Sequence, residues 1–257
     1  MFRPRVIPVL LLKNSGLVKS VNFKNYKYIG DPINSVKIFN DLKADELVFL
    51  DIDASIENRI PDLDLIKKIG AEANMPFAVG GGIKKLDDIK NILKAGAEKV
   101  ILNTHAFLNP DLIKTASNEF GSSTVTVSID VKKSLFFGKK IYIYGGKKLT
   151  FKNPVEYAKF VEDMGAGEII INSIDRDGSR KGYDLNLVFD ISSNVSIPVV
   201  ALGGAKDNQD FFNAINSGKA SAVAAGSKFV FHGPRCAVLI NYPNLDEKKN
   251  FLSFEKK

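Results

Sequence analysis

The chain has 257 residues, of which 45% are hydrophobic and 25% charged, with ten prolines and twenty glycines. This balance is typical of a globular chain and excludes the collagen-like and disordered classes. The single cysteine, Cys236, cannot form an internal disulfide, so we expect a protein of the reducing cytoplasm. The net charge is +7, but tryptophan is absent and the lysines are spread along the chain, so we expect no nucleic-acid partner. The apolar stretch at residues 6–12 is too short to span a membrane, and we expect no membrane partner.

Eight apolar runs bounded by turn signals predict eight buried strands. They are residues 5–12, 46–52, 75–79, 99–103, 124–129, 168–172, 197–202 and 221–225. The segments between them have helical spacing, and one begins with Asp31 and Pro32, a cap and first-turn pair. Apolar strands that alternate with amphipathic helices are typical of a parallel sheet with a covered outer face, and about 250 residues suit one closed barrel. The sequence therefore predicts the α/β class and a single (βα)8 TIM barrel domain over residues 1–257.

Two segments depart from this plan. Residues 132–151 follow the fifth strand with two apolar arms beside lysine pairs, which predicts an inserted hairpin. This hairpin could be a lid over the top face or a solvated basic hairpin. After residue 230 the sequence lacks the pattern of a regular eighth helix, so we expect an irregular C-terminal segment.

The chain also repeats itself. Residues 44–104 align without a gap on residues 166–226, so that Glu46 falls on Glu168 and Asp53 on Asp175, an offset of 122 positions. The matched residues include loop positions, so shared strand composition alone does not explain them. We therefore expect a barrel made of two duplicated halves.

Paired glycines follow the third and seventh strands, Gly81–Gly82 and Gly203–Gly204. Glycine lets backbone amides point at an anion, although it can also merely permit a tight turn. The fourth and eighth strands end in further donors, Asn103 with Thr104 and Gly226 with Ser227. Because the two sets are symmetric copies, they predict two phosphate cups on opposite sides of one mouth. The expected ligand is elongated and phosphorylated at both ends.

Four motifs now make a family resemblance visible: ELVFLDIDAS (46–55), AVGGGI (78–83), NTHAFLNP (103–110) and SIDRDGSRKGYD (173–184). Over about residues 3–230 the chain resembles the cyclase subunit of imidazole glycerol phosphate synthase. The resemblance implies a barrel that forms a heterodimer with a glutaminase docked on its bottom face. Ammonia would pass along the barrel axis and react with a bisphosphate nucleotide at the top face, in a lyase-type cyclisation.

The resemblance also implies which residues contact phosphate. They are Gly82, Asn103, Thr104, Asp177, Gly178, Gly203, Gly204, Gly226 and Ser227. Gly226 stands where the family more usually has serine, so we expect backbone contacts to dominate there. Neither histidine, His105 or His232, lies near a cysteine pair, and we expect no metal and no other cofactor.

The family uses two aspartates, at the ends of the first and fifth strands, as acid and base. The fifth strand here supplies Asp130, but the first has Leu11 at the corresponding position. Loss of one member of such a pair typically lowers the rate ~10²–10⁴-fold, so we do not expect efficient cyclisation. Taken without the resemblance, Asp130 could equally be a polar residue that caps the next turn.

Charged residues of alternating sign stand at the starts of four strands: Arg5, Glu46, Lys99 and Glu168. Charges in such places are usually only solvated, but the resemblance implies a ring that closes the axial ammonia passage. The loss of one catalytic carboxylate together with the retention of this ring indicates that the chain is a subunit that passes ammonia onward.

This combination, with LLLKNSGLVKS (10–20), resembles the branch of the family that accompanies sugar amidotransferases. Members of that branch are associated with a glutaminase and an ATP-dependent amidotransferase that acts on bacterial surface sugars of the lipopolysaccharide or O-antigen type. Two alternatives stay open. One is the cyclase of histidine biosynthesis, impaired by Leu11, and the other is a single-chain sugar isomerase on the same half-barrel plan.

Overall fold

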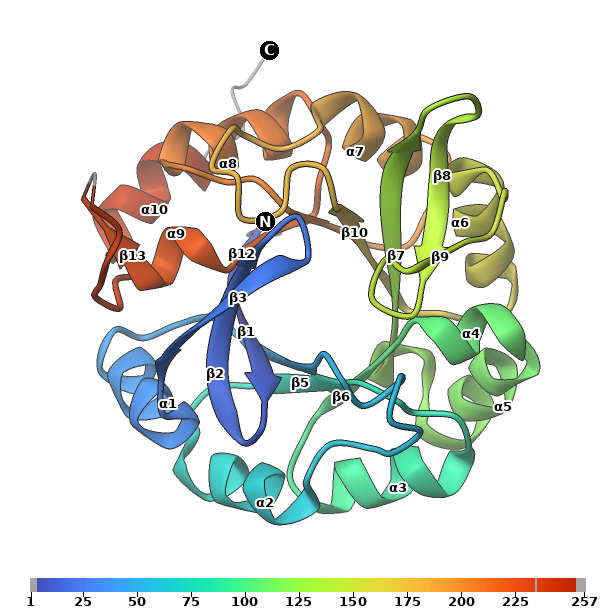
Figure 1. Ribbon diagram of the computed structural model, residues 1–257, viewed down its shortest axis with the longest axis horizontal. Coiled ribbons are helices and arrows are strands. Elements are labelled where there is room, and N and C mark those ends of the chain that lie inside the picture. Colours follow the sequence, from blue (N-terminus) through green and yellow to red (C-terminus); the bar gives the residue numbers. More distant parts are fainter. Residues whose placement is uncertain (1–3, 234, 253–257) are drawn as a thin grey trace.

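The computed structural model describes residues 4–233 and 235–252. Eight parallel strands pair side by side and close into a barrel with helices around it (Figure 1). In order around the barrel they are β1 (Arg5–Lys13), β4 (Leu47–Asp51), β5 (Phe77–Gly80), β6 (Lys99–Leu102), β7 (Val125–Ser134), β10 (Glu168–Ser173), β11 (Val199–Leu202) and β12 (Ala222–Ala225). Each strand overlaps one predicted apolar run, which confirms the TIM barrel.

Within residues 4–233, seven helices of eight to ten residues cover the strands. They are α1 (Pro32–Asp41), α2 (Leu63–Glu72), α3 (Leu86–Lys94), α5 (Asp111–Phe120), α6 (Pro154–Asp163), α7 (Leu185–Ser192) and α8 (Asn208–Asn216). The Asp31 side chain caps α1 by accepting the Asn34 N–H, with Pro32 in the first turn as predicted. Shorter helices, α4 (Thr104–Leu108), η1 (Ser122–Thr124) and α9 (Ser227–Val230), complete the ring. None of the helices in the described part of the chain combines the length and hydropathy of a membrane span.

The predicted half-barrel repeat is confirmed in detail by α3 and α8, whose bounds differ by the same offset as the sequence repeat. Their N-terminal caps match as well. The Asp88 carboxylate accepts the N–H of Lys84, and the Asp210 carboxylate accepts the N–H of Lys206. The two halves therefore share helix ends as well as strands.

A hairpin that the sequence did not predict follows β1. It consists of β2 (Gly16–Val21) and β3 (Lys24–Gly30), and it crosses in front of the barrel in Figure 1. Every residue of β3 is exposed or half-buried, so its sequence KNYKYIG carries no apolar alternation. Periodicity could not reveal a strand whose two faces both meet solvent.

The segment predicted as an inserted hairpin follows the barrel part of β7. The end of β7 pairs antiparallel with β8 (Gly138–Ile143), and β8 pairs antiparallel with β9 (Lys148–Leu149). The tip exposes Leu135, Phe136 and Phe137. Residues 131–152 hold seven lysines and no acidic residue, so the rest of the chain, with 36 − 7 = 29 basic and 29 acidic residues, is balanced.

The C-terminal segment is more regular than expected. It contains the ladder β13 (Phe231–His232) with β14 (Ala237–Val238) and a helix, α10 (Leu245–Leu252), that packs beside α8. The sequence of α10, LDEKKNFL, is mostly polar, which hid the helix from an apolar pattern. Ahead of α10, the Tyr242 hydroxyl donates to the Val6 carbonyl at 2.8 Å and accepts the Asp45 N–H at 2.9 Å. Tyr242 therefore fixes the backbone beside Arg5 and Glu46, two residues of the predicted charged ring.

Replacement of Tyr242 by phenylalanine should lower the free energy of unfolding by about 1–3 kcal/mol, because a buried carbonyl and a backbone N–H lose their shared partner. Urea unfolding measures the change. The matched control is Tyr28→Phe, at a side chain that is 66% exposed. Equal losses in the two variants would contradict the role given to Tyr242.

Candidate active site at the barrel mouth

A pocket lies at the carboxyl ends of the strands, where the two predicted phosphate cups meet. Leu11 and Asp130 both line it. Of the predicted phosphate contacts, those that line the pocket are Asn103, Thr104, Asp177, Gly178, Gly203, Gly204, Gly226 and Ser227. Gly82 is not among the lining residues, and its N–H donates to Ser55 Oγ at 3.1 Å.

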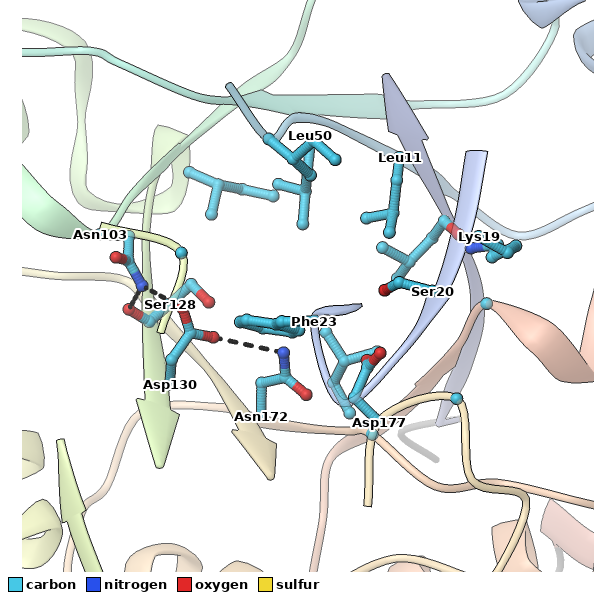
Figure 2. A pocket seen from close by; sticks show the side chains of 18 of the residues that line it. Leu11, Lys19, Ser20, Phe23, Leu50, Asn103, Ser128, Asp130, Asn172 and Asp177 are labelled. Atoms are coloured by element: carbon cyan, nitrogen blue, oxygen red, sulfur yellow. Dashed lines mark hydrogen bonds between the residues drawn. The ribbon is translucent and has the colours of Figure 1, made fainter. Parts of the chain in front are cut away.

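The Asp130 carboxylate is buried and hydrogen-bonded. It accepts from Asn103 Nδ2 at 3.1 Å and from Asn172 Nδ2 at 3.2 Å (Figure 2). Burial raises the pKa of Asp130 to about 7, against the lowering effect of the two amide hydrogen bonds, and the nearby charge of Asp177 raises it further. A carboxyl group with this pKa can both give and take a proton at neutral pH.

Two leucines lie on the wall of the mouth opposite Asp130. Since β1 and β7 are four strands apart in a ring of eight, Leu11 and Asp130 stand on opposite walls. Leu11 lies near Leu50 in Figure 2, with the ring of Phe23 between the leucines and Asp130. Leu11 offers no proton-transferring group on the wall where the family's second aspartate is expected.

A buried lysine and a half-buried carboxylate, Asp177, also lie at the mouth. Lys19 of β2 is 5% exposed and donates to the Val9 carbonyl. Burial lowers the pKa of Lys19 to about 8 despite the charge of Asp177, and burial raises the pKa of Asp177 to about 6 despite Lys19. A Cβ at position 226 would collide with the Lys19 ammonium group, so Gly226 leaves room for this lysine. Sequence reasoning missed Lys19 because it missed the hairpin that carries it.

The first phosphate cup is partly engaged by the protein itself. The Thr104 hydroxyl accepts the Tyr144 N–H at 3.0 Å. The Asn103 amide donates hydrogen bonds to the Asp130 carboxylate and to the Ser128 carbonyl. The role of these residues as phosphate donors stays a prediction. Asp51, a third carboxylate in the pocket, is held by Arg59 at 2.5 Å.

The four predicted ring residues meet at the opposite end of the barrel. Arg5 bonds to both Glu46 and Glu168, and Lys99 lies 3.3 Å from Glu46 and 3.1 Å from Glu168. All four are buried or half-buried. Buried apolar side chains lie between this ring and the mouth, among them Ile7, Val48, Ala78, Ile170, Val200 and Ala224. The described residues include no group of three or more histidine, cysteine, aspartate or glutamate side chains that could hold a metal ion.

The raised pKa of Asp130 predicts a pH-dependent loss of stability. Between about pH 4 and 7 the folded chain keeps Asp130 protonated while the unfolded chain ionises it, so stability falls as the pH rises through this window. Relative to Asp130→Asn, the wild-type chain should lose up to about 1.4 kcal/mol of unfolding free energy per pH unit. Urea unfolding of both proteins at pH 5, 6, 7 and 8 measures the difference. A difference that is constant with pH would refute the assignment.

Comparison with known proteins agrees with the fold. A family model described as "Histidine biosynthesis protein" matches residues 5–234. A protein of Pseudomonas aeruginosa named "Putative imidazole glycerol phosphate synthase subunit hisF2" is 48% identical, over 96% of this chain and 98% of its own length. A Vibrio vulnificus protein named "Putative imidazole glycerol phosphate synthase subunit hisF3" is 46% identical, over 98% and 97% of the two chains.

A third relative carries the name without qualification. The "Imidazole glycerol phosphate synthase subunit HisF" of Alkaliphilus metalliredigens is 43% identical over 90% of this chain and 92% of its own. With the family model matching the whole barrel and relatives similar over nearly their full length, the chain belongs to the histidine biosynthesis protein family, as a HisF-like member.

Proposed function

We propose that the chain is the barrel subunit of a glutamine amidotransferase complex. It takes ammonia from a glutaminase at its bottom face and delivers it at the mouth for amidation of a bacterial surface sugar by a separate ATP-dependent enzyme. The observation that carries the proposal is the contrast between the two ends of the barrel. The ring of Arg5, Glu46, Lys99 and Glu168 is complete, whereas Leu11 stands opposite Asp130 at the mouth.

The barrel interior suits the passage of neutral ammonia. Glutamine hydrolysis yields glutamate and ammonia, and in neutral water most of the ammonia takes up a proton. Apolar walls disfavour the ammonium ion, since transfer of an unpaired charge out of water is costly. A paired ring below such walls would admit ammonia only when its ion pairs open.

A second candidate, the cyclase of imidazole glycerol phosphate synthase, has support of its own. The pKa values of Asp130 and Asp177 are about 7 and 6, so two carboxyl groups at the mouth titrate near neutral pH. The names of the relatives also favour this reaction. The sugar isomerase is disfavoured, because it needs a carboxylate at Leu11 and has no use for the charged ring.

Substitution of aspartate for Leu11 distinguishes the first two candidates. With ammonium salt and the bisphosphate cyclase substrate, the Leu11→Asp variant should turn over at least ~100-fold faster than the wild-type chain, because it regains an acid–base pair across the mouth. The Leu11→Asn variant is the control, since asparagine has nearly the same shape as aspartate and cannot act as an acid or a base at neutral pH. Comparable rates for the wild-type chain and Leu11→Asp would contradict the claim that Leu11 disables the chemistry.

The complex itself tests the proposed function. Mixing the chain with its glutaminase should raise glutamine hydrolysis and bury at least ~1,200 Å² at the bottom face, the size of a standard interface. The absence of a complex at micromolar concentrations would refute the proposal.

Within that complex, Lys99→Ala and Glu168→Ala should lower the ratio of amidated product to glutamate released. Docking should persist, because rim charges contribute modestly to affinity. Lys68→Ala is the control, at an exposed lysine of α2 that lies outside the ring. Ratios equal to that of the wild-type chain in both ring variants would show that the ring does not govern coupling.

A further inference from the structure

One strand of the barrel presents polar side chains to the interior at three successive levels. Residues of β7 alternate in direction, and Val125, Val127 and Ile129 belong to the core between strands and helices. Thr126, Ser128 and Asp130 therefore face the barrel axis. Successive inward positions on a strand are about 6.6 Å apart, so the three side chains form a line along the axis.

The lowest member of this line is buried without a partner. Thr126 is 1% exposed, and its hydroxyl has no hydrogen-bond partner among the described residues. In the strand register it lies beside Glu168 of the charged ring on one side and Ile101 on the other. An unsatisfied buried hydroxyl costs about 1–3 kcal/mol, and valine has the same shape without that cost. The position therefore keeps a polar atom that the packing does not need.

The opposite wall has no such line. On β1, four strands away around the barrel, the inward positions at the same levels are Ile7, Val9 and Leu11. The two strands come from equivalent places in the two half-barrels. Leu11 is thus one end of a fully apolar row, and Asp130 is one end of a polar row.

We propose that Thr126 and Ser128 are binding stations for a small neutral hydrogen-bonding molecule, ammonia, on its way from the charged ring to Asp130. This inference rests on the proposed function. A hydroxyl donates to the single lone pair of ammonia and accepts from its N–H groups, and it gives the ammonium ion no counter-charge. Water shares this chemistry, so the test must separate the two.

The test compares Thr126→Val, which keeps the width of the passage, with Thr126→Ser, which keeps the hydroxyl. The complete complex, with its glutaminase and the nitrogen-accepting enzyme, receives glutamine labelled with ¹⁵N in the amide and excess unlabelled ammonium chloride. Mass spectrometry of the amidated product then gives the ratio of channelled to bulk nitrogen. We expect Thr126→Val to lower this ratio about five-fold, the effect of one lost hydrogen bond of ~1 kcal/mol, and Thr126→Ser to stay near the wild-type ratio.

A second measurement excludes a purely structural role. Thr126→Val should unfold at a higher urea concentration than the wild-type chain, since the buried hydroxyl has no partner to lose. The inference would be overturned if Thr126→Val is less stable than the wild-type chain and channels ammonia equally well. It would also be overturned if wild-type crystals show ordered water at Thr126 and Thr126→Val leaves channelling unchanged.

The two proposals fail in different ways. If the wild-type complex makes product without excess ¹⁵N, the proposal of an ammonia conduit is wrong, and so is the proposal that Thr126 and Ser128 bind ammonia. If the wild-type complex channels and Thr126→Val channels equally, the conduit stands and only the stations are wrong.

Discussion

Closure of the barrel by the parallel pairing of β10 with β7 is the constraint on which the site depends. In a closed ring of eight strands, every second side chain must face the axis. The strand starts then bring charged residues together at one end, and the strand ends bring the loops together at the other. Neither the charged ring nor the mouth could form in an open sheet, where the first and last strands lie far apart.

Duplication explains the frame of the molecule but not its chemistry. The caps of α3 and α8 have stayed alike, because each secures the same strand-to-helix turn. The inward-facing residues have diverged. Leu50 and Asn172 occupy equivalent positions in the two halves, yet only Asn172 donates a hydrogen bond to Asp130. The outer layer of the half-barrel is thus symmetric, while the inner layer has one apolar and one polar side.

The sequence was sufficient for the parts of the fold that bury apolar residues at regular spacing. All eight barrel strands and the Asp31 cap fall where the apolar runs and turn signals placed them. The ring residues could be named because a family resemblance supplied their role. Periodicity could not find β3, which is exposed on both faces, or the helix α10, which is largely polar.

Contacts between residues on different strands of the barrel could not be predicted from the sequence, for a different reason. The burial of Lys19 and the unpaired hydroxyl of Thr126 depend on residues distant in the sequence. Thr126 reads as an ordinary strand residue until the register with Glu168 is known. What a side chain faces across a closed barrel follows from the register of several strands at once, and no local pattern contains it.

The lysine-rich hairpin gives the molecule an electrostatic orientation. Because residues outside 131–152 are balanced in charge, the excess positive charge is centred on β7–β9, off the barrel axis and beside the mouth. An acidic body that approaches by diffusion is turned toward this side before contact, and the effect fades once the ionic strength shortens the Debye length to about 8 Å. The tip of the hairpin on this side exposes Leu135, Phe136 and Phe137. Steering of this kind acts on the rate of association more than on the final affinity.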